Sequence, residues 1–415
     1  MRRFILIFIM LSFFLTSCTS TNIAEPKQEK NIVESSTERV KAVWINYNEL
    51  SMKSEADKSE NAFRIKAENM MKSCAEYGFN RVFVQARPFC DAFYKSELFP
   101  ASEYLSGAQG EYIGYDALEI LCEYAHKYSL KIDAWINPYR VSYKTDINAL
   151  CEDSIARKWY FSDDNGRNVI VLPNGIYFNP AKDAVHKLIL DGVREIINHY
   201  DVDGIHMDDY FYPTTDSTFD ETEYADYTNS GGRMSLDEWR RENVNSLVSD
   251  IHTVVKSKDE RLIFSISPSG DIEKNVSAYY ADIPQWCKTG GYIDLIIPQL
   301  YYGFQNESKP FEDICLKWLA LERNENVSLC VGLAVYKYGK EDRYAGTGIS
   351  EWQENTDIIS RQIEFIGSQN ESIGVALYSY SYIFSKNNVN NYIFELQTIK
   401  NMIQGLYKIF YGVQE

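Results

Sequence analysis

The stretch VDGIHMDDYFYP, residues 202–213, decides the fold and carries the candidate chemistry. Residues 202–207 combine apolar side chains with one glycine and no proline, which favours a short buried β-strand. Two adjacent carboxylates, Asp208 and Asp209, follow the strand directly. Because side chains alternate between the faces of a strand, His206 and Asp208 are expected to point the same way. Asp209 reaches that side only if the backbone bends.

The acid pair has three interpretations. A carboxylate after a strand often caps a helix or forms a turn. Two carboxylates in series, on a strand that carries His206 and followed by four bulky residues, favour a functional site. A metal site is the third interpretation, but catalytic zinc usually takes three protein ligands, and this stretch holds no second histidine. We therefore expect a catalytic pair that works without a metal ion.

Outward from this stretch, short β-like runs alternate with longer helical ones. Strands are expected at residues 40–45, 81–85, 130–136, 202–207, 262–266, 293–297, 328–333 and 374–377. Helices are expected at residues 61–77, ending at Gly78, and at 115–128, 181–199, 235–255, 311–321, 352–366 and 390–403. This order predicts an α/β fold, a (β/α)8 TIM barrel, over residues 39–415.

Long irregular segments follow the second and third predicted strands, at residues 88–114 and 142–179. The second contains a hairpin that is expected to turn at residues 173–175. Loops of this length are unusual in a compact domain unless they shape a site. No glycine-rich phosphate loop follows a predicted strand, so we expect no nucleotide cofactor.

The predicted strands end in polar and aromatic residues rather than aliphatic ones. In a (β/α)8 barrel the active site lies at these carboxyl ends. Amide side chains there could hydrogen-bond sugar hydroxyls, and aromatic rings could stack on pyranose faces, although each could equally pack or cap the rim. The candidate substrate-binding residues are Trp44, Asn46, Gln85, Arg87, Asn137, Tyr139, Arg140, His206, Tyr210, Gln299, Tyr301, Tyr302 and Tyr380.

Composition and the amino terminus indicate which partners and which cellular location to expect. A net charge of −17 argues against a nucleic-acid partner, whose phosphates would be repelled, and 31 tyrosines suit a protein that stacks on sugars. Residues 1–18 have a basic start, an apolar run too short to span a bilayer, and the sequence LTSC ending at Cys18. They resemble a bacterial lipoprotein signal, followed by a polar tether at residues 19–38. We expect a lipid on Cys18 to anchor the chain on the extracytoplasmic side of a bacterial membrane; an ordinary signal peptide is the alternative.

The mature sequence resembles the bacterial glycosyl hydrolase-like ten family of envelope lipoproteins. The resemblance runs from VW at residues 43–44 through DGIHMDDYFYP and IIPQLYYG to the tyrosine-rich last strand. It implies a TIM-barrel hydrolase that cleaves peptidoglycan glycan strands between N-acetylmuramic acid and N-acetylglucosamine. Arg87 and Arg140 could then meet the lactyl carboxylate. DGIHMD is also similar to the fourth-strand motif of α-amylase-like barrels, whose nucleophile maps onto Asp208. His206 stands where those enzymes carry arginine, so amylase specificity does not follow.

Glycoside hydrolysis needs one group to protonate the leaving oxygen and another to stabilise or attack the anomeric carbon. In a first assignment Asp208 orients the substrate's own 2-acetamido group and Asp209 is the general acid, because neighbouring like charges raise one pKa. In a second, Asp208 attacks directly and Asp271 or Glu307 donates the proton. The rival interpretations are a hydrolase of another polysaccharide and a sugar-binding lipoprotein that has lost catalysis.

Overall fold

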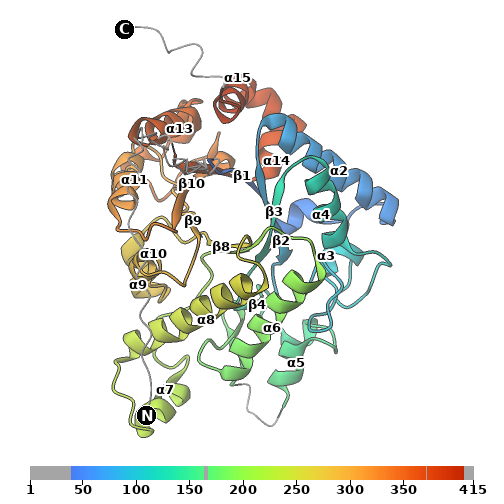
Figure 1. Ribbon diagram of the computed structural model, residues 1–415, viewed down its shortest axis with the longest axis vertical. Coiled ribbons are helices and arrows are strands. Elements are labelled where there is room, and N and C mark those ends of the chain that lie inside the picture. The colour runs from blue at the N-terminus through green and yellow to red at the C-terminus, as the bar shows by residue number, and fades with distance from the viewer. Residues whose placement is uncertain (1–38, 163–166, 371, 406–415) are drawn as a thin grey trace, which may run out of the picture. The chain divides into compact units, whose positions relative to one another are not determined.

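A closed barrel of eight parallel strands forms the centre of the computed structural model, which describes residues 39–162, 167–370 and 372–405 (Figure 1). Around the barrel the strand order is β1-β11-β10-β9-β8-β7-β3-β2. These strands are β1 (Lys41–Ile45), β2 (Arg81–Arg87), β3 (Lys131–Ile136), β7 (Gly204–Met207), β8 (Ile263–Ile266), β9 (Leu295–Ile296), β10 (Ser328–Ala334) and β11 (Gly374–Tyr378). The predicted (β/α)8 barrel is confirmed, with its sixth strand shortened to two residues.

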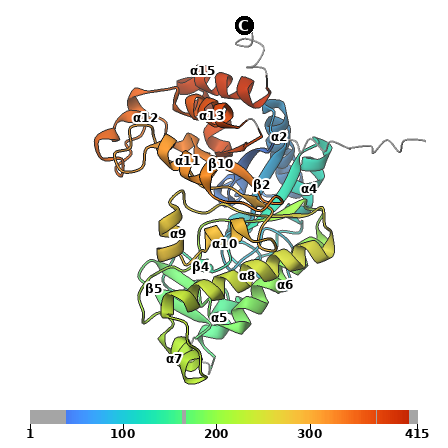
Figure 2. The same ribbon diagram turned by 60° about the vertical axis from the view of Figure 1, so that its left-hand side comes forward.

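Helices lie outside the barrel, and Figure 2 shows α6 and α8 side by side. The longer helices are α2 (Glu60–Tyr77), α4 (Ala117–Lys127), α6 (Asp183–His199), α8 (Leu236–Lys258), α11 (Phe311–Ala320), α13 (Ile358–Gln369) and α15 (Lys386–Ile403). The shorter ones are α1 (Tyr47–Leu50), α3 (Glu103–Ser106), α5 (Ile155–Tyr160), α7 (Glu221–Asn229), α9 (Ile272–Ala278), α10 (Ile283–Lys288), α12 (Glu351–Glu354) and α14 (Tyr380–Phe384).

Local sequence sets the limits of α2. At its start the Ser59 hydroxyl accepts a hydrogen bond from the backbone N–H of Ala62. At its end the chain turns through Gly78, whose φ of 103° lies in the left-handed region that glycine adopts without steric cost. The predicted end of this helix at Gly78 is confirmed.

The core has two layers. Outward-facing strand residues such as Val43 and Val84 pack in the larger core beneath the helices. Inward-facing residues alternate with them, as the two-residue period of a strand requires. They fill the barrel with the side chains of Ala42, Trp44, Phe83, Trp135, Leu295, Ile297, Cys330 and Ala376.

The long segments after β2 and β3 carry structure of their own. The first contains α3, and the second contributes an antiparallel sheet of β4 (Arg140–Ser142), β6 (Gly175–Phe178) and β5 (Val169–Leu172). The predicted hairpin is confirmed, since β5 and β6 pair beside its turn. A Cβ at Gly175 would lie 2.5 Å from the carbonyl oxygen of Ser142, and its φ is 147°, so this position requires glycine.

A buried ion pair, which we name the Arg240 clamp, fixes the segment that leads away from β7. Nε of Arg240, in α8, donates to both carboxylate oxygens of Asp220 at 3.1 and 3.0 Å, and both side chains are fully buried. The same guanidinium donates to the Tyr280 hydroxyl at 3.0 Å and to the carbonyl oxygen of Asp216 at 2.7 Å. Asp216 and Asp220, in the segment after β7, are thereby tied to α8 and to Tyr280 in the segment after β8.

Two predicted helices differ in extent. The helix expected at residues 352–366 is divided into α12 and α13, because Asn355 adopts an extended conformation, with φ −117° and ψ 129°, that ends α12. The last helix begins at Lys386, earlier than predicted, and has a kink at Tyr392.

The expectations for the amino terminus fall outside the described residues: the signal peptide at 1–18, the lipid on Cys18 and the tether at 19–38. In the part of the chain that the structure describes, no helix combines the length and apolar character needed to cross a membrane. The seven cysteines of that part are free thiols, and all but Cys151 are buried.

Candidate active site

Asp208 follows β7 at the carboxyl end of the barrel and is 2% exposed. Its Oδ2 accepts a hydrogen bond from the Trp135 indole N–H at 2.9 Å. Its Oδ1 accepts from the backbone N–H of Tyr210 at 3.3 Å and from the Asn137 amide at 3.4 Å. Three donors from two segments therefore hold this carboxyl group in one orientation.

The pKa values of both carboxyl groups are raised. Burial and the charge of Asp209 raise the pKa of Asp208 to about 7, although Arg140 and the hydrogen bond from Trp135 act in the opposite direction. Burial also raises the pKa of the half-buried Asp209, against the lowering effects of Gln299 and Arg140. Because the charge of Asp209 is among the causes that raise the pKa of Asp208, Asp208 does not titrate independently of its neighbour. Such a pair can supply a proton at pH 7, which general acid catalysis requires.

Trp135 belongs to the site and was missed in the sequence. It lies in β3, two residues before Asn137, so alternation along the strand places both side chains on the inner face. In the barrel register Trp135 is also the neighbour of His206 in β7. The sequence signal for Trp135 is its position two residues before Asn137, the polar residue at the end of the strand.

His206 supports the site from inside the barrel. Its ring is fully buried and stacks on Phe83, with ring centroids 4.2 Å apart. The Trp44 indole N–H donates to Nε2 at 3.0 Å, which leaves the proton on Nδ1 for the Ser265 hydroxyl at 2.8 Å. Burial lowers the pKa of His206 well below its usual value, so the ring is neutral. Trp44 and His206, both expected to bind substrate, here form the floor beneath the acid pair.

Aromatic rings and Arg140 surround the acids. The Arg140 guanidinium carbon lies 3.9 Å from the centre of the Tyr210 ring, and Tyr210 is 45% exposed. On another side the Tyr301 ring lies 6.0 Å from Tyr378, an aromatic residue absent from the predicted set. The Gln299 amide donates to the carbonyl oxygen of Ser267 at 2.9 Å. Asn137, Arg140, Tyr210, Gln299 and Tyr301 are thus brought together as the sequence predicted.

Three other predicted binding residues are directed elsewhere. The Arg87 guanidinium is 1% exposed and lies 4.7 Å from the centre of the Phe99 ring. Tyr139 is 1% exposed and part of the apolar core. The Tyr380 ring packs on Phe384, with centroids 4.7 Å apart.

Three more are engaged by the chain itself. Oδ1 of Asn46 caps α1 by accepting from the backbone N–H of Asn48 at 3.0 Å. Oε1 of Gln85 accepts from the backbone N–H of Tyr47 at 3.1 Å. Tyr302 is half-buried, with its ring beside Gly270. For these residues the geometry supplies a structural role, and substrate contact stays a prediction.

The two alternative proton donors occupy stabilising contacts. Oδ1 of Asp271 caps α9, and its Oδ2 pairs with the Lys309 ammonium at 2.5 Å. These contacts lower the pKa of Asp271, although partial burial raises it. Glu307 is exposed and accepts from the backbone N–H of Thr347 at 3.0 Å. A carboxyl group with a lowered pKa is a poor proton donor near neutrality. Across residues 39–162, 167–370 and 372–405, no group of three or more metal-ligating side chains is placed to hold a metal ion.

The comparisons with known proteins agree with this geometry. The sequence model of the glycosyl hydrolase-like 10 family matches residues 39–345. The glycosyl hydrolase YngK of Bacillus subtilis is 34% identical over 327 residues, which cover 73% of this chain and 62% of YngK. The chain therefore spans less than two thirds of that relative. The glycosyl hydrolase DigH of Escherichia coli is 28% identical over 330 residues, which cover 74% of this chain and 73% of DigH.

Among solved structures, the PgaB (BpsB) glycoside hydrolase domain from Bordetella bronchiseptica shares the fold with a TM-score of 0.59. The two are 11% identical, and the match covers 88% of this chain and 99% of that domain. The family match covers most of the chain and includes the acid pair, which confirms the resemblance expected from the sequence. The chain belongs to the glycosyl hydrolase-like 10 family.

Proposed function

We propose that this protein hydrolyses glycosidic bonds between N-acetylmuramic acid and N-acetylglucosamine in peptidoglycan glycan strands. The observation that carries the proposal is the pair Asp208 and Asp209, whose pKa values are both raised at the carboxyl end of the barrel. Tyr210 and Tyr301 offer ring faces for sugars beside the pair. Membership in a glycosyl hydrolase-like family supports the reaction class.

The first assignment of roles fits the contacts better. Three donors hold the carboxylate of Asp208, so its ionised form is suited to accept the N–H of the substrate's 2-acetamido group and align its carbonyl oxygen with the anomeric carbon. Asp209 is the more exposed acid and gives its proton to the glycosidic oxygen as the bond to that oxygen breaks. Water then attacks the cyclic intermediate, and Asp209 takes back a proton. Asp271 serves this chemistry less well, because Lys309 favours its ionised form.

Mass analysis of products tests the function. We expect the purified protein to convert glycan strands stripped of stem peptides into fragments that differ by whole disaccharide units. The mass of each new end identifies the linkage that was cut. Intact strands at all enzyme concentrations would overturn the proposal and leave a sugar-binding protein, and cleavage of a different polysaccharide alone would overturn the proposed substrate.

The same assay separates the two assignments. Asp209→Asn is expected to lower kcat by about 10²- to 10⁴-fold, the usual contribution of a general acid. Asp271→Asn and Glu307→Gln are expected to stay within about threefold of the parent rate. Both side chains accept hydrogen bonds from backbone N–H groups, and the loss of such a contact lowers the stability of the fold by only about 1 kcal/mol. The acetamido mechanism is wrong if Asp209→Asn remains active while either of the other two variants is inactive.

The localisation proposal rests on the amino terminus. The sequence LTSC before a polar tether supports a lipid-anchored protein on the extracytoplasmic side of a bacterial membrane. We expect Cys18→Ser to move the full-length protein from the membrane fraction to the aqueous phase of a detergent partition. Retention of that variant in the membrane fraction would contradict anchoring through Cys18.

A further inference from the structure

Four tyrosine rings at the carboxyl end of the barrel form a continuous row, which we name the tyrosine strip: Tyr301, Tyr378, Tyr336 and Tyr382. The first three lie at or just beyond the ends of the neighbouring strands β9, β11 and β10, and Tyr382 lies in α14. The ring centroids of Tyr301 and Tyr378 are 6.0 Å apart, those of Tyr378 and Tyr336 5.9 Å, and those of Tyr336 and Tyr382 6.1 Å. All four side chains are partly exposed, so the strip can be reached by a ligand.

The strip begins at the acid pair. Because β7 and β11 are parallel strands of one closed barrel, Asp208 and Tyr378 lie at the same end of it. Burial is the main cause of the raised pKa values of Tyr301 and Tyr378, and the charges of Asp209 and Asp208, respectively, contribute to them. The Tyr378 ring also lies beside the floor of the site, with its centroid 6.0 Å from that of Trp44. A sugar bound at the acid pair therefore has Tyr301 and Tyr378 as aromatic neighbours.

Lys340 lies at the other end of the strip. Its ammonium nitrogen is 5.0 Å from the centre of the Tyr382 ring and 5.6 Å from that of Tyr336. The side chain is exposed, and in the part of the chain that the structure describes its ammonium group forms no ion pair. An ammonium group over aromatic rings keeps its positive charge. Lys340 is thus a cation that remains available to an anionic ligand.

Two other lysines at this end of the barrel are engaged. Lys309 pairs with Asp271 at 2.5 Å, and Lys337 pairs with Asp342 at 2.6 Å. Lys337 also donates to the carbonyl oxygen of Tyr301 at 2.6 Å, which ties the segment after β10 to the segment after β9. The rings that these two segments carry are therefore held together before a ligand binds, which lowers the entropic cost of binding.

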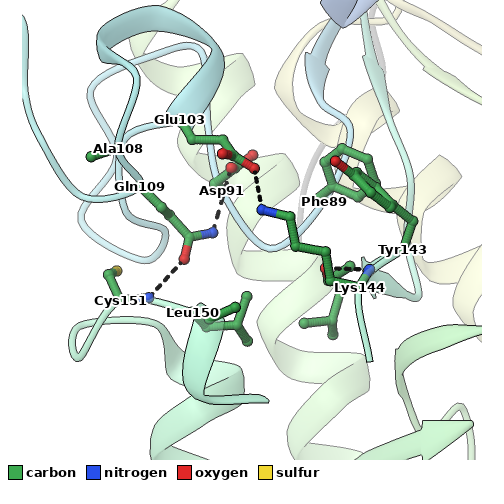
Figure 3. A pocket seen from close by; sticks show the side chains of 12 residues that line it. Phe89, Asp91, Glu103, Ala108, Gln109, Tyr143, Lys144, Leu150 and Cys151 are labelled. Atoms are coloured by element: carbon green, nitrogen blue, oxygen red, sulfur yellow. Dashed lines mark hydrogen bonds and ion pairs between the residues drawn. The ribbon is translucent and has the colours of Figure 1, made fainter. Parts of the chain in front are cut away.

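A larger pocket between the long loops after β2 and β3 has a different charge (Figure 3). It measures about 280 Å³, and its wall includes Asp91, Glu103 and Lys144. The Lys144 ammonium pairs with Glu103 at 3.1 Å, as Figure 3 shows. An anionic sugar in this pocket would meet two carboxyl groups, and its lysine is already paired. Lys340 is therefore better placed to receive an anion.

A small hollow lies beside Lys340. Its volume is about 40 Å³, and its wall includes Val335, Tyr336, Lys340, Tyr382 and Leu396. This volume holds about three water-sized groups, so it accepts a branch of a sugar and not a pyranose ring. Val335 and Leu396 offer aliphatic carbon to such a branch, and Lys340 offers a positive charge. The lactyl group of N-acetylmuramic acid matches these walls, because it carries both a methyl group and a carboxylate.

We infer that the tyrosine strip and Lys340 form a subsite that selects N-acetylmuramic acid in the strand being cleaved. Sugar units lie along the rings, and the Lys340 ammonium pairs with the carboxylate of one lactyl group. The inference rests on the proposed function and explains how a chain with a net charge of −17 recognises an anionic strand. Of the two arginines expected to meet this carboxylate, Arg87 is 1% exposed and does not reach it.

Strands without their negative charge test the pairing. Carbodiimide coupling with ammonia converts the lactyl carboxylates to uncharged amides and leaves the glycosidic bonds in place. The parent protein is expected to have a kcat/KM for native strands at least about threefold above that for amidated strands. Lys340→Met is expected to lower this ratio by about three- to fivefold, the value of one exposed ion pair, through KM and not kcat. Lys340→Arg keeps the charge and is expected to retain the ratio. An unchanged ratio in Lys340→Met overturns the inference.

Lys317→Met is the matched control. Lys317 is exposed in the second half of α11, which leads from the end of β9 toward the start of β10 and so away from the acid pair. The control removes the same charge from the chain and is expected to leave the ratio unchanged. A fall equal to that of Lys340→Met would overturn the inference, because net charge alone would then decide the preference.

Tyr336→Leu examines the rings. Leucine keeps apolar bulk but removes the ring face, so KM for native and for amidated strands is expected to rise by a similar factor of about five. A KM that rises for neither strand would show that the substrate does not follow the strip, and the inference would be wrong.

Direct binding separates this inference from the proposed function. If the parent protein cleaves no strand, the function fails, and calorimetry with native and amidated strands still examines the subsite. Tighter binding of native strands that is lost in Lys340→Met but kept in Lys317→Met supports the subsite. Equal binding of both kinds of strand by the parent protein, or binding of neither, overturns it.

Discussion

Asp208→Asn is expected to lower kcat by about 10³-fold or more and at the same time to raise the stability of the fold. Activity is lost under either assignment of roles, because an amide can neither attack the anomeric carbon nor accept the acetamido N–H as a carboxylate does. The amide oxygen can still accept from Trp135, but the NH2 group then faces the Asn137 amide and the Tyr210 N–H, which both donate to Oδ1 of the aspartate. The measurement is kcat on denuded strands together with chemical denaturation of the same variant.

The gain in stability follows from the raised pKa. Asp208 has a pKa of about 7 in the fold, whereas the unfolded chain ionises near its ordinary value. The folded state therefore holds a proton that the unfolded state has released, and stability falls as the pH rises from about 4 to about 7. About three pKa units correspond to a loss of about 4 kcal/mol at pH 8, which asparagine abolishes. Its NH2 group, however, replaces an acceptor oxygen that faces donors, at a cost of about 1–3 kcal/mol. The free energy of unfolding should therefore rise by about 2 kcal/mol at pH 8 and by less at pH 5.

The control for this pair of measurements is Asp153→Asn, whose side chain is 89% exposed. It is expected to leave both kcat and the pH dependence of stability unchanged. A variant Asp208→Asn that is destabilised at pH 8, or that retains activity, would contradict the account of the acid pair.

The second large effect concerns the Arg240 clamp. Arg240→Leu is expected to lower the free energy of unfolding by about 3–5 kcal/mol, because it leaves the Asp220 carboxylate buried without its partner. Urea denaturation measures the loss. A change smaller than about 1 kcal/mol would show that Asp220 finds another partner or becomes protonated at little cost.

A double replacement separates the effect of losing the ion pair from the cost of leaving the Asp220 carboxylate buried without a partner. In Arg240→Leu combined with Asp220→Leu, neither charge remains, and part of the stability is expected to return. Arg240→Lys keeps the charge but loses the forked geometry that reaches Asp220 and Tyr280 together, so an intermediate loss is expected. Recovery in the double variant would show that the cost comes from burying one charge alone.

The alternation of side chains in strands made much of the barrel and its acid pair predictable. Apolar runs separated by helical segments located all eight strands, and the acids after the fourth strand lie at its carboxyl end. Alternation fails at Arg87, because a register shift between Gln85 and Arg87 puts Arg87 beside Ile136. The guanidinium consequently lies over Phe99 instead of facing the barrel interior. A bulge of this kind leaves no mark in the residue pattern.

Burial of aromatic rings was the other limit. Tyr139 and Tyr210 both follow a strand end, yet one is 1% exposed and the other 45% exposed. Tyr139 packs in the apolar core, whereas Tyr210 lies against the Arg140 guanidinium, and this tertiary packing is not encoded in the local sequence. Trp135, by contrast, was within reach, since its spacing from Asn137 already places it on the inner face.

The floor formed by Trp44 and His206 determines how Asp208 and Asp209 can exchange protons. Both imidazole nitrogens are occupied, by the Trp44 indole and by the Ser265 hydroxyl, and the ring stays neutral. The imidazole therefore neither relays protons downward through the barrel nor titrates alongside the carboxyl groups above it. Asp208 and Asp209 therefore exchange protons only with substrate or water at the open end of the barrel. Any inflection in the pH dependence of activity near pH 7 is assigned to these carboxyl groups and not to His206, which is two residues from Asp208 in the sequence.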